Sequence, residues 1–277
     1  MVGMPRAIWN GAISFGLVNV PVQLFSAVEP KDIHFHQFTK SGQRIRYKRV
    51  SDKSNREVDY DDIVKGYELS KGKFVLVTPE ELGAADPRQT RTIDIEDFVE
   101  LSEIDPIYFE SSYYLAPRNG AAHAYALLRE AMERSERIAI GRFVMRTKQY
   151  LAAIRPSGNV LVLETMFFPD EIRDPKALDI PGRVKVAERE RRVAEQLIDS
   201  LTVAWDPKRY EDTYREEVLS IIKKKAKGQE IVAEEAPAPD RKVVDLFEAL
   251  QSSLEATKGR NRKRTKSAAG SRRRKAS

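Results

Sequence analysis

The chain has 277 residues, contains no cysteine and carries a formal net charge of +6 at pH 7. Its last twenty residues hold ten Lys/Arg and no Asp or Glu. Removing these ten from the 48 basic residues leaves 38 against 42 acidic residues, so residues 1–257 sum to −4. The absence of cysteine excludes disulfides, thiolate nucleophiles and Cys-ligated zinc. The charge distribution indicates a near-neutral body with a cationic tail, which is common in proteins that bind nucleic acids.

An uncharged run at residues 7–28 is long enough to be a signal peptide or a membrane helix. However, polar residues, glycines and Pro21 interrupt the run, and its apolar residues are mostly β-branched or aromatic. Several of them alternate with other residues, which is the pattern of a strand. We therefore predict two buried strands, Ile8–Phe15 and Val18–Ser26, and no membrane span in the chain.

Predicted strands dominate residues 1–170, separated by Gly, Pro, Asn and Asp. Two helices are expected among them, a short one capped by Thr78 and a longer one over Gly120–Ser135. The further predicted strands are Arg44–Val50, Phe74–Thr78, Thr92–Leu101, Ile107–Ala116, Ile138–Thr147, Tyr150–Arg155 and Val160–Phe168.

From residue 186 onwards, apolar residues recur at helical spacing. One helix is predicted over Val186–Leu201, and a second opens at Asp206 and ends in three lysines before Gly228. Residues 229–239 are predicted to be a linker, after which Asp240 is expected to cap a third, amphipathic helix. The stretch after Thr257 lacks apolar anchors and is expected to be disordered.

No motif of a common enzyme class is present. The chain lacks a phosphate-binding glycine loop, an HExxH motif and a GxSxG motif. His34 and His36 would share one face of an extended strand, but no third metal ligand follows at a recognisable spacing. Carboxylates cluster at residues 59–62, 94–97 and 170–174, and a nuclease could build a metal site from such acids. We favour the structural interpretation, in which these acids lie on polar strand faces and at helix caps.

The basic residues of the body are more informative. Arg44, Arg46 and Lys48 share one face of the predicted strand 44–50, with Arg49 beside them. A row of cations on one face packs poorly in a core and suits a row of phosphates, although each residue could instead be a solvated charge. Such contacts would make binding independent of base sequence and strongly salt-dependent. The weaker candidates, three of which are expected to share strand parity, are Arg142, Arg146, Lys148 and Arg155.

Five blocks of sequence resemble bacterial Ku proteins. The opening block, Arg6–Val22 (RAIWNGAISFGLVNVPV), closely resembles the start of those proteins. Together the blocks cover about residues 6–225, and several ordered blocks are far more specific than one motif. The remaining four, in order, are Arg44–Val50 (RIRYKRV), Asp62–Glu68 (DIVKGYE), Phe168–Pro175 (FPDEIRDP) and Arg209–Tyr214 (RYEDTY).

The resemblance implies a mainly β fold with some α. Its expected parts are a β-barrel core with a strand-rich arch over residues 1–185, a helical arm over 186–228, a linker and amphipathic helix over 229–257, and a disordered basic tail. It also implies a ring-shaped homodimer that threads onto double-stranded DNA ends, protects and bridges them, and acts in non-homologous end joining. Such a protein recruits a multifunctional ATP-dependent DNA ligase and has no catalytic activity or cofactor of its own. We expect it in the cytoplasm, on the nucleoid.

The resemblance also suggests roles for particular residues. The row at residues 44–49 falls where the arch should lie, so it is assigned to the DNA-facing channel. The second set of cations supplies weaker candidates for the same channel. Candidates for docking a partner such as the ligase are Tyr210, Tyr214, Leu246, Phe247 and Leu250. The tail is predicted to contact duplex DNA away from the end, with a solubilising tail as the alternative. Its cations are Lys258, Arg260, Arg262, Lys263, Arg264, Lys266, Arg272, Arg273, Arg274 and Lys275.

Two other functions stay open at this point. One is a metal-dependent enzyme built on the acid clusters, and the other is a general DNA-binding protein in which only the tail binds. The chain also departs from the family pattern, because some relatives carry a Cys-x-x-Cys pair just after the arch row. Here Ser51–Asn55 occupies that stretch, so no cysteine-based metal site can exist there.

Overall fold

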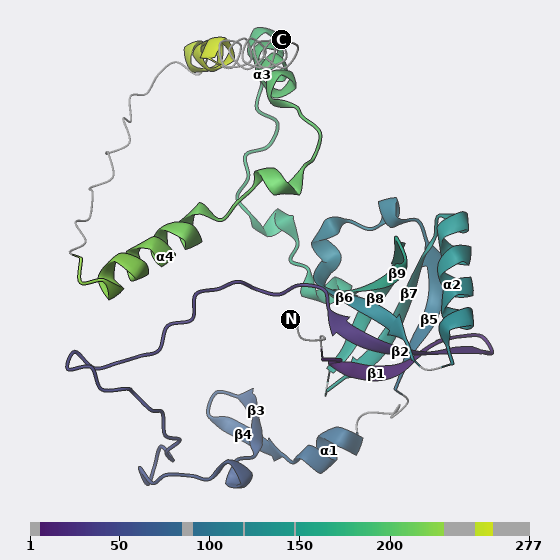
Figure 1. Ribbon diagram of the computed structural model, residues 1–277, viewed down its shortest axis with the longest axis vertical. Helices are drawn as coiled ribbons and strands as arrows, with labels where there is room; N and C mark the ends of the chain where they lie inside the picture. The colour runs from purple at the N-terminus through teal and green to yellow at the C-terminus, as the bar shows by residue number, and fades with distance from the viewer. Residues whose placement is uncertain (1–5, 85–90, 119, 147, 230–246, 257–277) are drawn as a thin grey trace, which may run out of the picture. The chain divides into compact units, whose positions relative to one another are not determined.

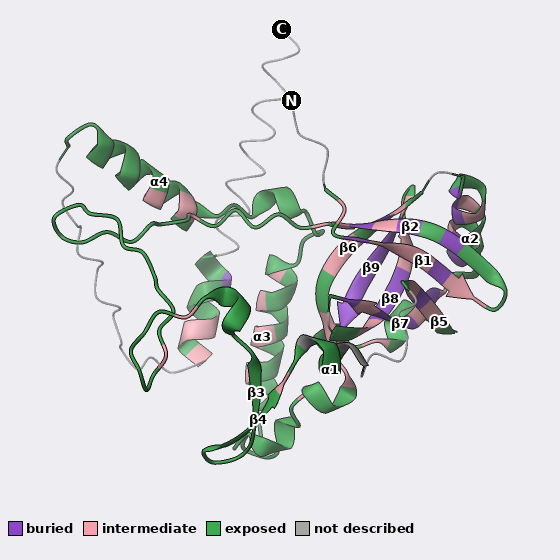
Figure 2. Cartoon of the chain, turned by 90° about the horizontal axis from the view of Figure 1, so that it is seen from below, coloured by how far each residue is buried: buried purple, intermediate pink, exposed green. Residues whose placement is uncertain are grey.

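A computed structural model describes residues 6–84, 91–118, 120–146, 148–229 and 247–256 of the chain. It divides into two compact units, Met1–Ala177 and Leu178–Ser277. Buried residues concentrate in the barrel and the helix α2 of the first unit, whereas most of the remaining ribbon is exposed (Figure 2). The first unit therefore contains nearly all of the hydrophobic core.

Seven strands of the first unit form a closed barrel in the order β1-β2-β6-β9-β8-β7-β5 (Figure 1). Neighbouring strands are antiparallel except β1 and β5, which pair in parallel over residues 12–14 and 92–94. The barrel within a mixed β and α fold confirms the expected fold class. Its strands are β1 (Trp9–Phe15), β2 (Val18–Ser26), β5 (Thr92–Val99), β6 (Phe109–Pro117), β7 (Ile138–Met145), β8 (Lys148–Ser157) and β9 (Val160–Met166).

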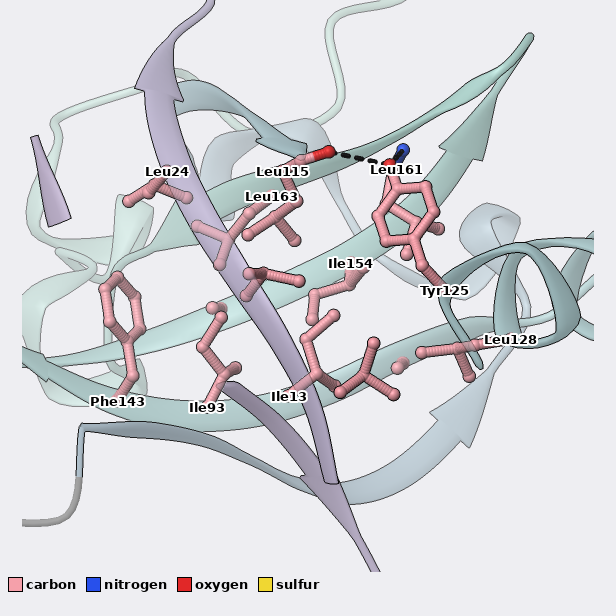
Figure 3. Close-up of a cluster of buried hydrophobic side chains, with 14 of the residues drawn as sticks. Ile13, Leu24, Ile93, Leu115, Tyr125, Leu128, Phe143, Ile154, Leu161 and Leu163 are labelled. Carbon is pink, nitrogen blue, oxygen red and sulfur yellow. Dashed lines mark hydrogen bonds between the residues drawn. The ribbon is translucent and has the colours of Figure 1, made fainter. Parts of the chain in front are cut away.

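Alternation along the strands fills the barrel. In β2, Val20, Val22 and Leu24 are fully buried while the intervening residues are exposed or half-buried, as expected when successive side chains point to opposite faces. The uncharged run at the N-terminus is thus a pair of barrel strands, as predicted. Figure 3 shows the resulting cluster, to which β1, β5, β6, β7, β8 and β9 also contribute. No helix within the described residues is long and apolar enough to cross a membrane.

Helix α2 (Ala122–Ser135) packs against this core through Tyr125, Leu128 and Met132, which have the i, i+3, i+7 spacing of one helix face. The Tyr125 hydroxyl donates to the Leu115 carbonyl at 2.6 Å and accepts from the Leu161 amide at 2.7 Å (Figure 3). Leu115 of β6 and Leu161 of β9 are cross-strand partners. One side chain of α2 therefore bridges two barrel strands.

The segment between β2 and β5 carries a separate two-stranded ribbon, β3 (Lys65–Ser70) and β4 (Lys73–Val77), followed by α1 (Pro79–Ala84). The capping box expected at α1 is confirmed, because the Thr78 and Glu81 side chains each accept a bond from the other's backbone amide. Sequence patterns identified β4 but missed β3. Short 3₁₀ turns lie at Tyr60–Asp62, Leu101–Glu103, Pro106–Tyr108, Pro169–Glu171 and Pro175–Ala177.

The second unit contains α3 (Glu188–Leu201), a 3₁₀ turn at Pro207–Arg209, α4 (Thr213–Ala226) and a helix over residues 247–256. The prediction of one helix opening at Asp206 was wrong. Asp206 caps only the 3₁₀ turn, and a second cap, Asp212, accepts from the Arg215 amide to start α4. Between them Tyr210 has extended backbone dihedrals, which ends the first turn. The expected start of the third helix at Asp240 lies outside the described residues.

We predict that Tyr125→Phe lowers the free energy of unfolding by about 1–3 kcal/mol, because it leaves the buried Leu161 amide without its partner. Urea denaturation of the two proteins measures the difference. Burial raises the pKa of the Tyr125 phenol above 10.0. Its contribution should therefore be complete below that pH and disappear as pH rises through the higher folded-state pKa. If the free energies of unfolding of the wild type and the variant changed in parallel from pH 8 to 11, that result would contradict the role assigned to this hydroxyl.

Candidate nucleic-acid interface

The chain leaves the barrel after β2 and returns at β5 by a long insertion, which has no core of its own among the residues whose burial is described. No residue described between positions 28 and 78 is buried. The whole insertion, residues 27–91, holds thirteen Lys/Arg against eleven Asp/Glu, a surplus of two positive charges, whereas residues 1–257 as a whole are net negative. The insertion therefore concentrates positive charge on an exposed part of the first unit.

The cationic segment 44–50 is not the regular strand that the sequence predicted. Its ends form isolated bridges, Arg44 with Phe38 and Val50 with Glu57, and no continuous ladder joins them. The Ile45 amide donates to the Gln37 carbonyl at 3.0 Å, and the Val58 amide donates to the Arg49 carbonyl at 2.9 Å. The segment thus pairs with one neighbour before it and another after it. Because it changes partner midway, its β-favouring residues do not build one strand.

Side chains along this segment differ in their contacts. Tyr47 donates to the Gln37 side chain, and the Arg49 guanidinium lies 5.1 Å from the centre of the Tyr60 ring. By contrast, the side chains of Arg44 and Arg46 have no ion-pair or hydrogen-bond partner among the described residues. Two cations of the predicted row are therefore available to an external anion.

Lys48, the third residue of the row, pairs with Glu57 at 2.7 Å. Both side chains are more than half exposed, and an ion pair in such a setting contributes no more than about 1 kcal/mol. Replacing the Glu57 carboxylate by a DNA phosphate as the partner of Lys48 would therefore cost little free energy. Contact of the row with DNA stays a prediction.

The parity argument for the second set of cations was wrong. Arg146 lies between β7 and β8, with a positive φ of 63°. Because of the turn at this position, the even-numbered residues of β8 lie on the same face of the sheet as the odd-numbered residues of β7. Lys148 pairs with Met145 on the side that includes the core residues Phe143 and Tyr150, whereas Arg142 lies on the opposite face. The strands therefore do not present these cations as a row.

Three of the four cations in this set are already paired with acids. The Arg142 guanidinium lies 2.8 Å from Glu96, and the Lys148 ammonium lies 3.7 Å from Glu171. Neither acid was recognised from the sequence as a partner, because each is distant along the chain. Their roles as DNA contacts stay predictions that would require these pairs to open.

Arg155 is held more firmly than the others. Two of its guanidinium nitrogens donate to one Glu164 oxygen at 2.8 and 3.1 Å, and Ser112 donates to the other. The Glu164 side chain is only 9% exposed. Removing its partner would leave a buried carboxylate with insufficient compensation, which is costly. The contacts of Arg155 therefore favour a structural role on the outer face of the barrel.

The acid clusters do not form a recognisable metal centre. Within the parts of the chain that the structure describes, no group of three His, Asp or Glu residues could hold a metal ion. Glu96 is paired with Arg142 and Glu171 with Lys148. Glu171 also accepts from the Phe168 amide, and Asp174 accepts from the Lys176 amide, so both cap 3₁₀ turns. The carboxylates whose contacts are defined therefore act as ion-pair partners and caps.

The second unit exposes aromatic side chains. Trp205, which the sequence patterns did not single out, stacks on Tyr210 with ring centres 5.1 Å apart. Both are more than 60% exposed, as is Tyr214 at the start of α4. Of the other partner candidates, Phe247 and Leu250 are half-buried. Leu246 and the ten tail cations lie outside the described residues.

Comparisons with known proteins agree with this architecture. The family model for the Ku70/Ku80 beta-barrel domain matches residues 14–198. A non-homologous end joining protein Ku from Anaeromyxobacter sp. (strain K) is 47% identical over 98% of this chain and 92% of its own length. Those of Heliobacterium modesticaldum and Bacillus subtilis (strain 168) are 43% and 40% identical, over 93% of this chain and 94% and 84% of their own lengths. The closed barrel agrees with the family model that matches the chain, and the relatives match over nearly the whole chain. This protein therefore belongs to the Ku family.

Proposed function

We propose that this protein binds the ends of double-stranded DNA without sequence preference and acts, without catalysis, in non-homologous end joining. The observation that carries the proposal is the cationic insertion between β2 and β5. It is exposed and lacks a core, and two arginines of its basic row have no partner among the described residues. Family membership supports the same function, because the matching relatives are named for end joining.

We further propose that two copies form a ring that threads onto a DNA end. The β3–β4 ribbon supports this, because apolar side chains lie exposed on both of its faces. Phe74 and Leu76 share one face, and Tyr67 and Val75 share the other. An isolated two-stranded ribbon is at best marginally stable in water. A second copy of the same ribbon is the simplest cover, because a two-fold interface is self-complementary.

We also propose that the second unit recruits the end-joining ligase. Exposed Trp and Tyr side chains are over-represented among residues that dominate protein–protein binding energy, and Trp205, Tyr210 and Tyr214 fit that description. Residues 202–214 hold three acids and two bases, so the segment has no positive surplus to attract DNA. Its composition favours a protein partner, and the end-joining ligase is the partner expected for this family.

The basic row should contribute directly to the salt dependence of DNA binding. We predict that changing Arg44, Arg46 and Lys48 together to Gln weakens duplex binding. The slope of log K against log salt should become shallower by about 0.9 for each phosphate that the protein no longer neutralises. Fluorescence anisotropy at several salt concentrations measures the slope. An unchanged slope would show that the row does not contact the DNA.

Arg155→Gln is the matched control for this experiment. It removes one positive charge per subunit but leaves the basic row intact. We expect it to lower the free energy of unfolding by about 1.5–3 kcal/mol, because Glu164 loses charged hydrogen bonds. At a temperature where the variant is still folded, its salt slope should match that of the wild type. A shallower slope would instead place Arg155 at the DNA.

Threading predicts a requirement for free ends. At equal length and moderate salt, the protein should be retained on linear duplex and released from the same duplex closed into a circle. The chain truncated after Thr257 should keep this preference, whereas a protein in which only the tail binds would lose all affinity. Phe74→Ser combined with Leu76→Ser should sediment as a monomer and lose the preference. Equal retention on both DNA forms by the truncated chain would rule out the ring.

Ligase recruitment should depend on the exposed aromatic pair. We predict that Trp205→Ala with Tyr210→Ala weakens capture of the end-joining ligase at least about tenfold, because hot-spot aromatics contribute disproportionately to binding. Val203→Ala, at an exposed apolar residue in the same segment, should have little effect. Surface plasmon resonance with immobilised ligase compares them. Equal affinities for all three proteins would move the docking surface elsewhere.

A further inference from the structure

A short hairpin over residues 37–45, here called the basic hairpin, lies within the insertion between β2 and β5. Across its loop the Thr39 amide donates to the Gln43 carbonyl at 2.8 Å. The loop has three residues and ends at Gly42, whose φ of 83° is the left-handed conformation that closes loops of this kind. The hairpin is thus held by its own backbone bonds and by the conformation of one glycine.

Phe38 and Arg44 lie directly opposite each other in the basic hairpin. Backbone hydrogen bonds flank this pair on both sides, which is the arrangement that brings opposite residues closest, with Cα atoms about 4.5 Å apart. Their side chains project from the same face. Phe38 is 54% exposed, and Arg44 is exposed with no ion-pair or hydrogen-bond partner among the described residues. The face therefore presents an aromatic ring beside a guanidinium that no described acid neutralises.

The chain around this pair carries positive charge only. Residues 33–51 hold five Lys/Arg and no Asp or Glu. Among the described residues, Lys40 and Arg46 have no ion-pair partner either. Two copies of such a surface repel each other, whereas a polyanion is attracted to it. Charge complementarity therefore favours nucleic acid over a second copy of this chain as the occupant of the hairpin face.

Phosphate contacts account for the cations of the hairpin but not for its exposed ring. Phe38 has no group that could donate a hydrogen bond to a phosphate oxygen, and inside a duplex each base face is covered by the next base pair. Unpaired nucleotides at an overhanging end offer a free base face to the ring and a phosphate to the guanidinium. Sites that bind single strands combine the same two elements, cations along the backbone and aromatic rings on which bases stack.

The β3–β4 ribbon differs from the basic hairpin in the residue that faces its phenylalanine. There Phe74 lies opposite Glu68, and Leu76 shares the face of Phe74. A ring between a carboxylate and a leucine suits a protein surface, because the carboxylate repels the DNA backbone. The pairing of an exposed ring with an arginine therefore separates the two aromatic surfaces of the insertion by the partner that each can accept.

We propose that the basic hairpin binds the unpaired nucleotides of an overhanging DNA end. The Phe38 ring stacks on a base, Arg44 binds an adjacent phosphate, and Lys40 and Arg46 supply further cations to the same strand. Every base has a face on which a ring can stack, so the site adds a preference for overhangs without adding a sequence preference. This inference rests on the proposed binding of DNA ends and names the part of a broken end that the hairpin contacts.

The first test uses one duplex, blocked at its far end, with a blunt end, a deoxythymidine overhang or an abasic overhang of equal length. Both overhangs are made with 5′ and with 3′ polarity. The abasic overhang carries the same phosphates without bases, so the difference between the two overhangs measures stacking. Fluorescence anisotropy at moderate salt should show at least about fivefold tighter binding of the deoxythymidine overhang in one polarity or both.

The outcomes of this test separate the overhang site from the proposed function. Binding of the blunt duplex together with equal binding of the two overhangs, in both polarities, would overturn the overhang site and leave the proposed function standing. A protein that bound none of the ends would contradict the proposed function, and the overhang site would fail with it.

Phe38→Ala tests the ring itself. Because Phe38 is exposed, its replacement leaves the hydrophobic core intact. It should abolish the difference between the two overhangs without changing the affinity for the blunt end, and Phe38→Trp should retain the difference. A Phe38→Ala protein that kept the preference would overturn the site. One that sedimented as a monomer, beside a dimeric wild type, would show that the ring packs against a second copy, which would also overturn it.

Tyr47→Ala is the matched control. It removes a ring that is 80% exposed in the same segment. The Tyr47 hydroxyl donates to the Gln37 side chain, and Gln37, as the neighbour of Phe38, projects from the other face of the hairpin. The variant should therefore keep the preference for the deoxythymidine overhang. An equal loss of preference in Tyr47→Ala and Phe38→Ala would overturn the assignment to the Phe38 face.

Photo-crosslinking locates the stacked base directly. The full chain is bound to a duplex that carries 5-iodouracil at the first unpaired position of the overhang and is then irradiated. Mass spectrometry should find the nucleotide attached to Phe38 in the wild type. An adduct confined to Tyr47, or to residues outside the basic hairpin, would overturn the proposal.

Discussion

The parallel pairing of β1 with β5 closes the barrel, and the rest of the first unit depends on this closure. A closed barrel has no unpaired strand edge, and its core is completed by the strands together with helix α2. The chain between β2 and β5 therefore does not have to cover the core. This freedom explains how about fifty consecutive residues can run from one barrel strand towards another without a buried side chain.

The cations of the body differ in the free energy needed to break their ion pairs before they can bind a phosphate. This difference says more about DNA binding than the number of cations does. Arg155 and Glu164 meet where the carboxylate is almost completely shielded, so that pair resists exchange for a phosphate. Lys48 and Glu57 meet in water, where exchange costs little. Arg44 and Arg46 need to give up no ion pair among the described residues. A body with a net negative charge can thus present a surface suited to DNA, because its acids neutralise cations selectively.

Local patterns predicted the parts of the fold in which neighbouring segments are also neighbours in sequence. The β1–β2 and β8–β9 hairpins and α2 follow directly from alternation, turn residues and helical spacing. The failures arose where a distant partner or a single turn decides the outcome. Segment 44–50 has strand-forming residues but changes its pairing partner, and the turn at Arg146 moves Lys148 to the face opposite Arg142. Glu96 and Glu171 could not be identified as partners, since sequence spacing carries no signal for contacts between segments that are distant along the chain.

The second unit follows the opposite principle to the barrel. Its helices bury almost nothing among the described residues, and its best-shielded side chain belongs to the short segment at 247–256. Helices of this length gain most of their stability from packing, so binding and folding are coupled wherever a partner covers an apolar stripe. The same holds for the β3–β4 ribbon, whose apolar faces need a cover. If the proposed recognition lies on these elements, their order depends on assembly, whereas the closed barrel has a buried core of its own.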